Sequence, residues 1–336
     1  MNPTPNPFLP FFQRQGFVLL DGGLATALEA KGFDLRDPLW SARVLLEAPE
    51  AVRAVHTEYL EAGADCIATV TYQATFPGFA ARGLSRSAAE EAFRRAVTLA
   101  VEARDDFWSR PANREGRLRP LVAASVGPYG AFLADGSEYT GRYDLDEQAL
   151  VAWHGPRWRL LASLPVDVMA CETVPSLAEA RALARLLGET PGRWGWISFQ
   201  CRDDVHLADG TPVEEAARAA TTTATASLPA PGVAAVGVNC VPPERVSPLL
   251  DAMRAVTASP LVVYPNAGET YDPVEKVWRP GSPAVDPVAL APGWRRQGAR
   301  VLGGCCRTGP GTIQAMRSAL LASTWDPMGR GERPLE

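Results

Sequence analysis

Three of the six cysteines in this chain lie where their thiol groups could share a metal ion. Cys240 ends the segment "GVNC", and Cys305 and Cys306 follow two glycines in "GGCC". Neighbouring side chains of an extended strand point to opposite faces, so the adjacent pair can reach one ion only if the backbone leaves that geometry. Gly303 and Gly304 permit such a departure. A shared metal site is therefore one interpretation of the three thiols.

Three thiolates form a soft donor set that suits tetrahedral zinc, with Zn–S bonds of about 2.3 Å and a fourth position open to a substrate. Spacing alone leaves alternatives, because Cys305 and Cys306 could instead form a strained vicinal disulfide or two core thiols. Cys66 is expected in the core, whereas Cys171 or Cys201, near other strand ends, could complete the coordination. A zinc–trithiolate centre is a poor Lewis acid but holds an incoming thiol as thiolate, which favours thioether formation.

Eight short apolar segments, each followed by a helical pattern, would position these cysteines. The segments span residues 17–23, 64–72, 121–128, 166–174, 194–201, 233–240, 261–267 and 299–306. Helical spacing is clearest at 49–64, 87–108 and 176–188. Buried strands that alternate with amphipathic helices predict an α/β fold with a parallel sheet, and eight such units predict a (β/α)8 TIM barrel. A doubly wound open sheet is the alternative, but the chain carries no recognisable nucleotide loop.

The segment order predicts one domain over residues 1–336, with the barrel at about 17–322. The Pro-rich start at 1–10 and the tail at 325–336 are expected to be peripheral. The connection at 129–147 is long, polar and aromatic, and it follows the third strand. Since long loops at the carboxyl ends of barrel strands often build the active site, we expect this connection to take part in it.

Composition and motifs exclude several classes of protein. The chain is 46% hydrophobic with a net charge of −5, and its 31 Arg and 2 Lys are scattered, so nucleic acid is not an expected partner. Without an apolar run of about 18 residues or a signal sequence, we expect no membrane association and a cytoplasmic location. Neither Lys31 nor Lys276 follows a glycine, which excludes a P-loop NTPase. His56, His154 and His206 are too far apart for a local metal pair, and His56 is expected to serve packing.

Five segments together resemble the homocysteine S-methyltransferase family over about residues 17–322. They are "DGGLATALEAKG" at 21–32, "GADCIATVTYQATFPGF" at 63–79, "ACETVPS" at 170–176, "GVNC" at 237–240 and "GGCC" at 303–306. The resemblance implies a (β/α)8 barrel that binds Zn²⁺ through Cys240, Cys305 and Cys306. Homocysteine and a methyl donor are then the implied small-molecule substrates.

The resemblance also implies a set of substrate-binding residues: Asp21, Gly22, Gly23, Thr69, Tyr72, Gln73, Glu172 and Asn239. Glu172 resembles the family carboxylate that holds the homocysteine ammonium group, although a strand-end Glu could also only support a neighbour. Asp21 with its two glycines resembles a first-strand turn that seats the amino acid, the alternative being a plain turn. The second-strand residues would lie beside substrate and donor.

The methyl donor is expected to be a sulfonium ion, S-methylmethionine, with S-adenosylmethionine as a second donor. Betaine-using relatives carry an aromatic residue where this chain has Gln73 and a C-terminal extension that this sequence lacks. Rings such as those of Tyr72, Tyr129, Tyr139 or Tyr264 could face the cation, or could serve packing. A betaine-type donor, a redox-responsive zinc protein and a metal-free lyase or aldolase remain the competing hypotheses.

Overall fold

Eight parallel strands form a closed barrel in the computed structural model, which describes residues 4–35, 41–222, 232–268, 270–272, 277–279 and 285–323. The strands are β1 Val18–Leu19, β2 Cys66–Ala68, β3 Leu121–Val126, β4 Val168–Val174, β5 Gly195–Phe199, β6 Val233–Asn239, β7 Leu261–Tyr264 and β10 Ala299–Leu302. They are hydrogen-bonded in the order β1-β10-β7-β6-β5-β4-β3-β2. A parallel bridge between Leu20 and Cys66 joins the two ends of this sheet. The predicted (β/α)8 TIM barrel is confirmed.

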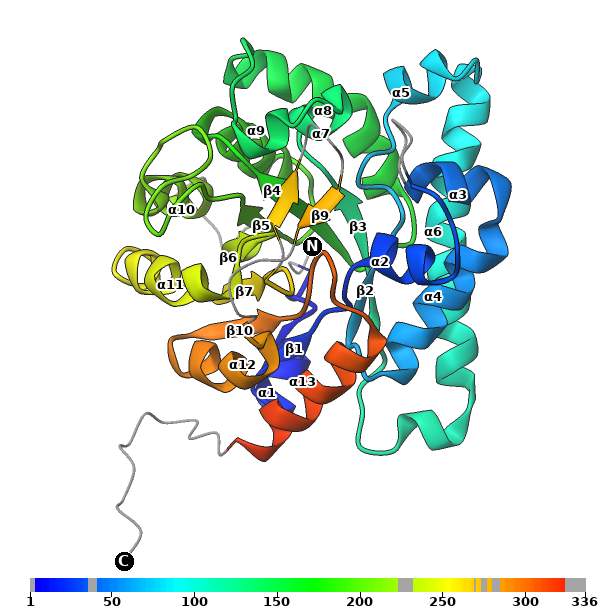
Figure 1. Ribbon diagram of the computed structural model, residues 1–336. Helices are drawn as coiled ribbons and strands as arrows, with labels where there is room; N and C mark the ends of the chain where they lie inside the picture. The colour runs from blue at the N-terminus through cyan, green and yellow to red at the C-terminus, as the bar shows by residue number, and fades with distance from the viewer. Residues whose placement is uncertain are drawn as a thin grey trace, which may run out of the picture.

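Helices surround the barrel on its outside (Figure 1). They are α1 Leu9–Arg14, α2 Leu24–Ala30, α3 Ser41–Glu47, α4 Pro49–Glu61, α5 Phe76–Ala81, α6 Arg86–Ser109, α7 Tyr129–Leu133, α8 Glu147–Ser163, α9 Leu177–Gly188, α10 Val213–Thr222, α11 Val246–Arg254, α12 Pro287–Arg296 and α13 Pro310–Ala322, with the 3-10 turns η1 Pro111–Arg114, η2 Ser137–Tyr139 and η3 Pro243–Arg245. Side-chain caps begin several of them, as Ser85 does for α6 and Ser176 for α9. The three helices expected from spacing are all present.

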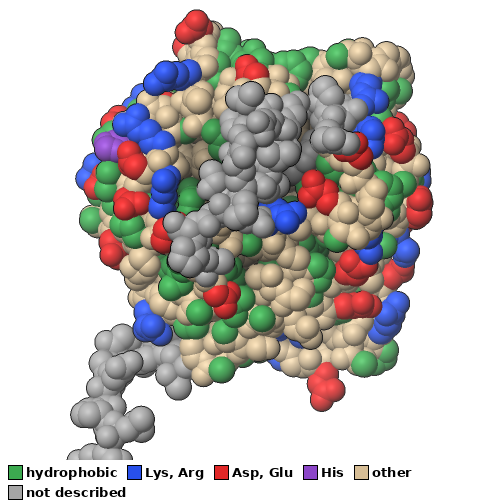
Figure 2. Space-filling model, viewed as in Figure 1, with side chains coloured by type: hydrophobic (Ala, Val, Ile, Leu, Met, Phe, Trp, Pro, Cys, Tyr) green, Lys and Arg blue, Asp and Glu red, His purple; other side chains and the backbone are tan. Residues whose placement is uncertain are grey.

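Among the described helices, none has the length and apolar character needed to cross a membrane. On the face shown in Figure 2, Lys and Arg side chains are interspersed with Asp and Glu. After β7 the chain forms an antiparallel hairpin, β8 Thr270–Asp272 and β9 Val277–Arg279, which the strand pattern did not predict.

The barrel interior is closed at the amino ends of the strands by residues that precede β1. Phe8 is fully buried and Phe11 nearly so, and both belong to the cluster of apolar side chains inside the barrel. The Phe8 ring lies 6.1 Å from that of Trp196 on β5. The expectation that residues 1–10 are peripheral is therefore wrong at Phe8, because the open end of the barrel requires an apolar cover. The tail at 325–336 lies outside the described residues.

The seam between β1 and β2 depends on the buried carboxylate of Asp65. The backbone N–H of Asp65 donates to Leu19 O at 2.6 Å, and the side-chain oxygen Oδ2 of Asp65 accepts from the Leu19 N–H at 3.0 Å. Gln15 Nε2 donates to the same oxygen at 2.7 Å, and Arg317 lies 3.1 Å from Oδ1. The carboxylate thus joins the first strand, the second strand and the last helix at the point where the barrel closes.

We expect Asp65→Ala to destabilise the fold by about 3–5 kcal/mol, because it leaves the Arg317 guanidinium and the Leu19 N–H without their buried partner. Urea unfolding followed by circular dichroism measures the loss. Asp105→Ala is the matched control, since that carboxylate pairs with Arg104 and Arg119 but is half exposed, and should cost less than about 1 kcal/mol. Equal losses in the two variants would contradict the role given to Asp65.

Candidate active site

A pocket opens at the carboxyl ends of the barrel strands. Its lining includes every residue that the family resemblance assigned to the metal or the substrates: Asp21, Gly22, Gly23, Thr69, Tyr72, Gln73, Glu172, Asn239, Cys240, Cys305 and Cys306. These residues come from the ends of β1, β2, β4, β6 and β10, so segments that are far apart in sequence meet at one place. This is the face of a (β/α)8 barrel where active sites are built.

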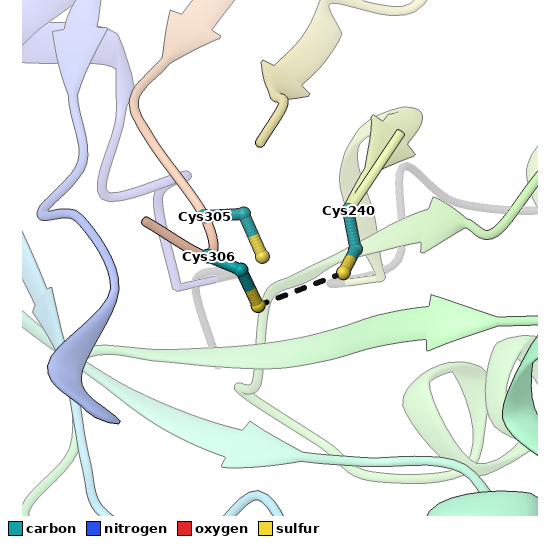
Figure 3. Close-up of side chains that lie close together, drawn as sticks. All are labelled: Cys240, Cys305 and Cys306. Atoms are coloured by element: carbon teal, nitrogen blue, oxygen red, sulfur yellow. Dashed lines mark hydrogen bonds between the residues drawn. The ribbon is translucent and has the colours of Figure 1, made fainter. Parts of the chain in front are cut away.

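The sulfur atoms of Cys240, Cys305 and Cys306 all lie within 4.8 Å of one another. Figure 3 shows Cys240 facing the adjacent pair from the opposite side, and the Sγ atoms of Cys240 and Cys306 are 3.8 Å apart. Two sulfurs bound tetrahedrally at about 2.3 Å from one zinc ion would be about 3.8 Å apart. The three thiols therefore fit the donor set and the spacing of a metal site.

The chain leaves the extended geometry before it reaches the adjacent cysteines. Strand β10 ends at Leu302, and a turn follows in which Arg307 has a φ of 66°. The Gly304 N–H donates to Asp21 O at 3.1 Å and the Cys305 N–H to Pro265 O at 2.8 Å, which fixes the path of this turn. Cys240 itself adopts a φ of 54° just after β6. Both thiols of the pair can thus face Cys240, and all three are free rather than joined in a disulfide.

The turn that carries Cys305 and Cys306 is held against the end of β1. The Gly23 N–H donates to Thr308 O at 2.9 Å, and the Tyr59 hydroxyl lies 2.9 Å from Gly23 O and 3.1 Å from Thr308 O. A Cβ on Gly23 would lie 2.6 Å from Cys305 O. Glycine is required here because two backbones approach closely. The approach joins the first strand to the cysteine turn, which the motif "DGG" alone did not indicate.

Glu172 projects from the end of β4 into the barrel and is held by hydroxyl groups. Its Oε2 accepts from the Tyr264 hydroxyl at 3.0 Å, and its Oε1 accepts from the Ser125 hydroxyl. The Tyr264 oxygen in turn accepts from Trp196 Nε1 at 3.0 Å and lies 2.5 Å from Ser198 Oγ. Burial raises the pKa of Glu172 to about 7. An arriving cation would favour its charged form.

Asn239 positions the end of β4 beside Glu172. Its Oδ1 accepts from the Thr173 N–H at 2.7 Å, and its Nδ2 donates to Thr173 Oγ1 at 2.8 Å. Thr173 has a φ of 62°, a left-handed conformation that is unusual for a β-branched residue. Asn239 Nδ2 also lies 4.0 Å from Cys305 Sγ. Its amide therefore connects the strained end of β4 to the cysteine cluster.

Thr69, Tyr72 and Gln73, which follow β2, line the pocket. The polar groups of Thr69 and Gln73 form hydrogen bonds with other parts of the protein. Thr69 Oγ1 accepts from the Ser125 N–H at 3.1 Å and lies 2.7 Å from Thr71 Oγ1. Gln73 Nε2 donates to Ala131 O at 3.0 Å, which ties the end of β2 to α7. Asp21 accepts from the Ala68 N–H at 2.8 Å, and burial raises the pKa of its carboxyl well above the ordinary value.

The titratable lining of the pocket is acidic. Among the described residues that form it are the carboxylates of Asp21, Glu29, Glu138 and Glu172, but no Lys, Arg or His. Tyr72, Tyr139 and Tyr264 contribute rings to the lining. Tyr129, considered with them, is absent from it and instead packs edge-on against Trp153, with ring centroids 5.0 Å apart.

Several functional neighbours were not recognised in the sequence. Glu138 lies in the connection 129–147, whose length and composition were the available signal. Ser125 and Thr308 carried no such signal, because single hydroxyl residues are common near strand ends. The remaining cysteines, Cys66, Cys171 and Cys201, are buried and fall outside the group of possible ligands found in the described chain.

The histidines serve other parts of the fold. His56 is fully buried on α4, as expected for packing. His154 is also fully buried, and its Nε2 lies 2.7 Å from Glu179 Oε1. His206 lies 3.0 Å from Asp203. None of the three belongs to the cysteine cluster.

Comparison with known proteins agrees with this geometry. A family model described as homocysteine S-methyltransferase matches residues 18–320. A homocysteine S-methyltransferase of Bacillus subtilis (strain 168) is 46% identical over 92% of this chain and 96% of its own length. A selenocysteine Se-methyltransferase of Brassica oleracea var. italica is 43% identical over 91% and 90%, respectively.

A solved structure shares the same fold. The crystal structure of the metallated form of a homocysteine methyltransferase from Escherichia coli matches with a TM-score of 0.81 and 41% identity, covering 93% of this chain and 99% of that chain. Residues 18–320, which the family model matches, include the barrel strands and the turns that carry the three cysteines. The chain therefore belongs to the homocysteine S-methyltransferase family and is a methyltransferase.

Proposed function

We propose that this enzyme transfers a methyl group from a sulfonium donor to the thiol of L-homocysteine, forming methionine. S-methylmethionine is the proposed donor, with S-adenosylmethionine as a second. The observation that carries the proposal is the cluster of Cys240, Cys305 and Cys306 in a pocket whose described titratable lining is otherwise only acids and tyrosines. A zinc ion bound by these thiolates would keep the homocysteine sulfur ionised at neutral pH.

Glu172 is proposed to hold the ammonium group of homocysteine. Its carboxylate is fixed by Ser125 and Tyr264, so it presents an oriented negative charge inside the barrel. An ammonium group in contact with it would form a charge-assisted hydrogen bond. Asp21, Gly22 and Gly23 form the adjacent wall, and Asn239 keeps the end of β4 in place. The amino acid would thereby be oriented with its sulfur toward the cysteines.

The reaction requires positioning more than proton transfer. The homocysteine sulfur forms a bond to the methyl carbon, and the electron pair of the broken carbon–sulfur bond stays on the donor sulfur. The donor leaves as a neutral thioether, so it needs no acid, and the thiol proton passes to solvent. The residues of the pocket contribute by holding two sulfur atoms in line with the methyl carbon about 3–3.5 Å from the attacking sulfur.

The environment of Gln73 supports a sulfonium donor over betaine. Its side-chain amide donates to Ala131 O at 3.0 Å and lines the pocket beside Tyr72. A trimethylammonium group is best recognised by a cage of aromatic faces, and an amide side chain supplies none.

A cytoplasmic location is also proposed, because the site needs reduced thiols, which that compartment maintains.

Removing one cysteine tests the metal site. We expect the purified protein to hold about one equivalent of zinc per chain and Cys240→Ser to lose most of it, together with methionine formation. Metal content by mass spectrometry and methionine by chromatography are the two measurements. Cys201→Ser is the matched control, since that buried thiol lies outside the cluster, and it should keep its zinc. Full zinc content in Cys240→Ser would contradict the proposed ligands.

Glu172→Gln tests the ammonium site. We expect the KM for homocysteine to rise about 10- to 100-fold, since hydrogen bonds to charged groups contribute about 1.5–3 kcal/mol, while the donor KM changes less than about twofold. Because the pKa of Glu172 is raised to about 7, protonation below that pH should increase the wild-type homocysteine KM up to about tenfold per pH unit. The Gln variant should lack this dependence. A pH profile that is identical in both proteins would remove Glu172 from this role.

A donor panel tests the proposed reaction directly. With homocysteine at saturation, we expect methionine formation to be fastest with S-methylmethionine, slower with S-adenosylmethionine and near background with betaine. The physical reason is that a thioether is a better leaving group than a tertiary amine, and that Gln73 presents an amide to the donor instead of a further aromatic ring. Initial rates for each donor at equal concentration give the ranking. A preference for betaine would show that the role of Gln73 was misjudged.

A further inference from the structure

The segment between β3 and α8 forms one wall of the pocket. Ala134, Gly136, Glu138 and Tyr139 all line it, and one carboxylate oxygen of Glu138 is buried. The segment folds back on itself closely, because a Cβ on Gly130 would lie 2.5 Å from Glu138 N. Glu138 therefore has a fixed backbone position at the mouth of the barrel, although it belongs to a long connection.

A buried cluster beneath this wall holds both ends of the segment. Glu179 on α9 is fully buried and accepts from the Tyr129 N–H at 2.7 Å and from the Tyr143 hydroxyl. His154 Nε2 lies 2.7 Å from the same carboxylate, and Arg157 lies 3.1 Å from His154 Nδ1. These contacts connect α8 and α9 to the residues before and after η2. The wall is therefore held in place by helices of the barrel.

The wall lies where the methyl donor must bind. The acceptor sulfur would sit beside the three cysteines, and the donor methyl group must come within about 3–3.5 Å of it. The Tyr139 hydroxyl is 4.0 Å from Cys240 Sγ, so η2 reaches the immediate surroundings of the cluster. Glu138, Tyr72 and Tyr139 line this same pocket, so the carboxylate and the two rings share its wall.

The other carboxylates of the lining have different tasks. Asp21 accepts from the Ala68 N–H, Glu172 is fixed at the acceptor end of the pocket, and Glu29 lies 3.9 Å from the Arg307 guanidinium. We infer that Glu138 is the side chain that selects a positively charged methyl donor, with the neighbouring tyrosine rings of η2 and β2 as its apolar walls. This inference rests on the proposed function and names the residue that recognises the sulfonium group.

The chemistry fixes the sign of the effect. The positive charge of the sulfonium diminishes as the methyl group leaves, because the electron pair of the carbon–sulfur bond returns to the donor sulfur. A carboxylate beside it therefore stabilises the bound donor at least as strongly as the transition state. Loss of that carboxylate should weaken donor binding without slowing the methyl transfer step. The KM for the donor should therefore rise while kcat stays the same.

The test compares Glu138→Gln with the wild-type enzyme, loaded with zinc and supplied with saturating homocysteine. We expect the KM for S-methylmethionine to rise about 10-fold or more, with kcat and the homocysteine KM within about twofold. Glu138→Asp keeps the charge and should recover part of the donor affinity. Asp135→Asn is the matched control, because it removes an exposed carboxylate of the same segment that accepts hydrogen bonds from Ser137 and does not line the pocket, and its donor KM should equal that of the wild type.

The outcomes separate this inference from the proposed function. If the wild type methylates homocysteine from S-methylmethionine but Glu138→Gln keeps its donor KM, the role of Glu138 is overturned and the proposed function stands. A fall in kcat with equal changes in both KM values would indicate a merely structural role and would also overturn it. If the wild type accepts no sulfonium donor, the proposed function itself fails, and the inference fails with it.

Discussion

The site depends on one local departure from strand geometry, the turn that follows β10. An extended backbone would send the side chains of Cys305 and Cys306 to opposite faces. Because the strand ends at Leu302 and the chain then turns, both thiols face Cys240 across the mouth of the barrel. The turn is held against the end of the first strand, since Thr308 O accepts from the Gly23 N–H and the Gly304 N–H donates to Asp21 O. The convergence of the three thiols is thus a consequence of barrel closure, and the beginning and end of the barrel build it together.

Sequence reasoning found the barrel because buried strands leave a strong signal. Each of the eight apolar segments became a strand, and the cysteines lie at the strand ends where the barrel model placed them. Spacing could not decide whether Cys305 and Cys306 converge, because that depends on hydrogen bonds from Gly304 and Cys305 to the remote carbonyl groups of Asp21 and Pro265, which no local pattern encodes. Phe8 was misjudged for a related reason, since its partner Trp196 is remote in sequence.

Above the apolar interior, the barrel holds a polar layer that is ordered before any substrate arrives. Trp196, Ser198 and Tyr264 form a chain of hydrogen bonds that ends on Glu172. Such a network is costly to bury unless every member has a partner, and here the partners come from three different strands, β4, β5 and β7. Strain is concentrated at the same place, where Asn239 holds the residue after Glu172 in a left-handed conformation. The carboxylate is therefore oriented by the scaffold and not by its ligand.

The acidic character of the described pocket matches the charges of the proposed reactants. Methyl transfer from a sulfonium to a thiolate removes one positive and one negative charge and yields two neutral thioethers. A lysine or arginine beside the acceptor sulfur would stabilise the thiolate, which would make it a weaker nucleophile, and would repel the donor. Carboxylates would attract the proposed donor, and three thiolate ligands would keep a bound metal ion from drawing charge away from the attacking sulfur. A lining of carboxylates, thiols and tyrosines is thus the arrangement that attracts the cation and keeps the acceptor reactive.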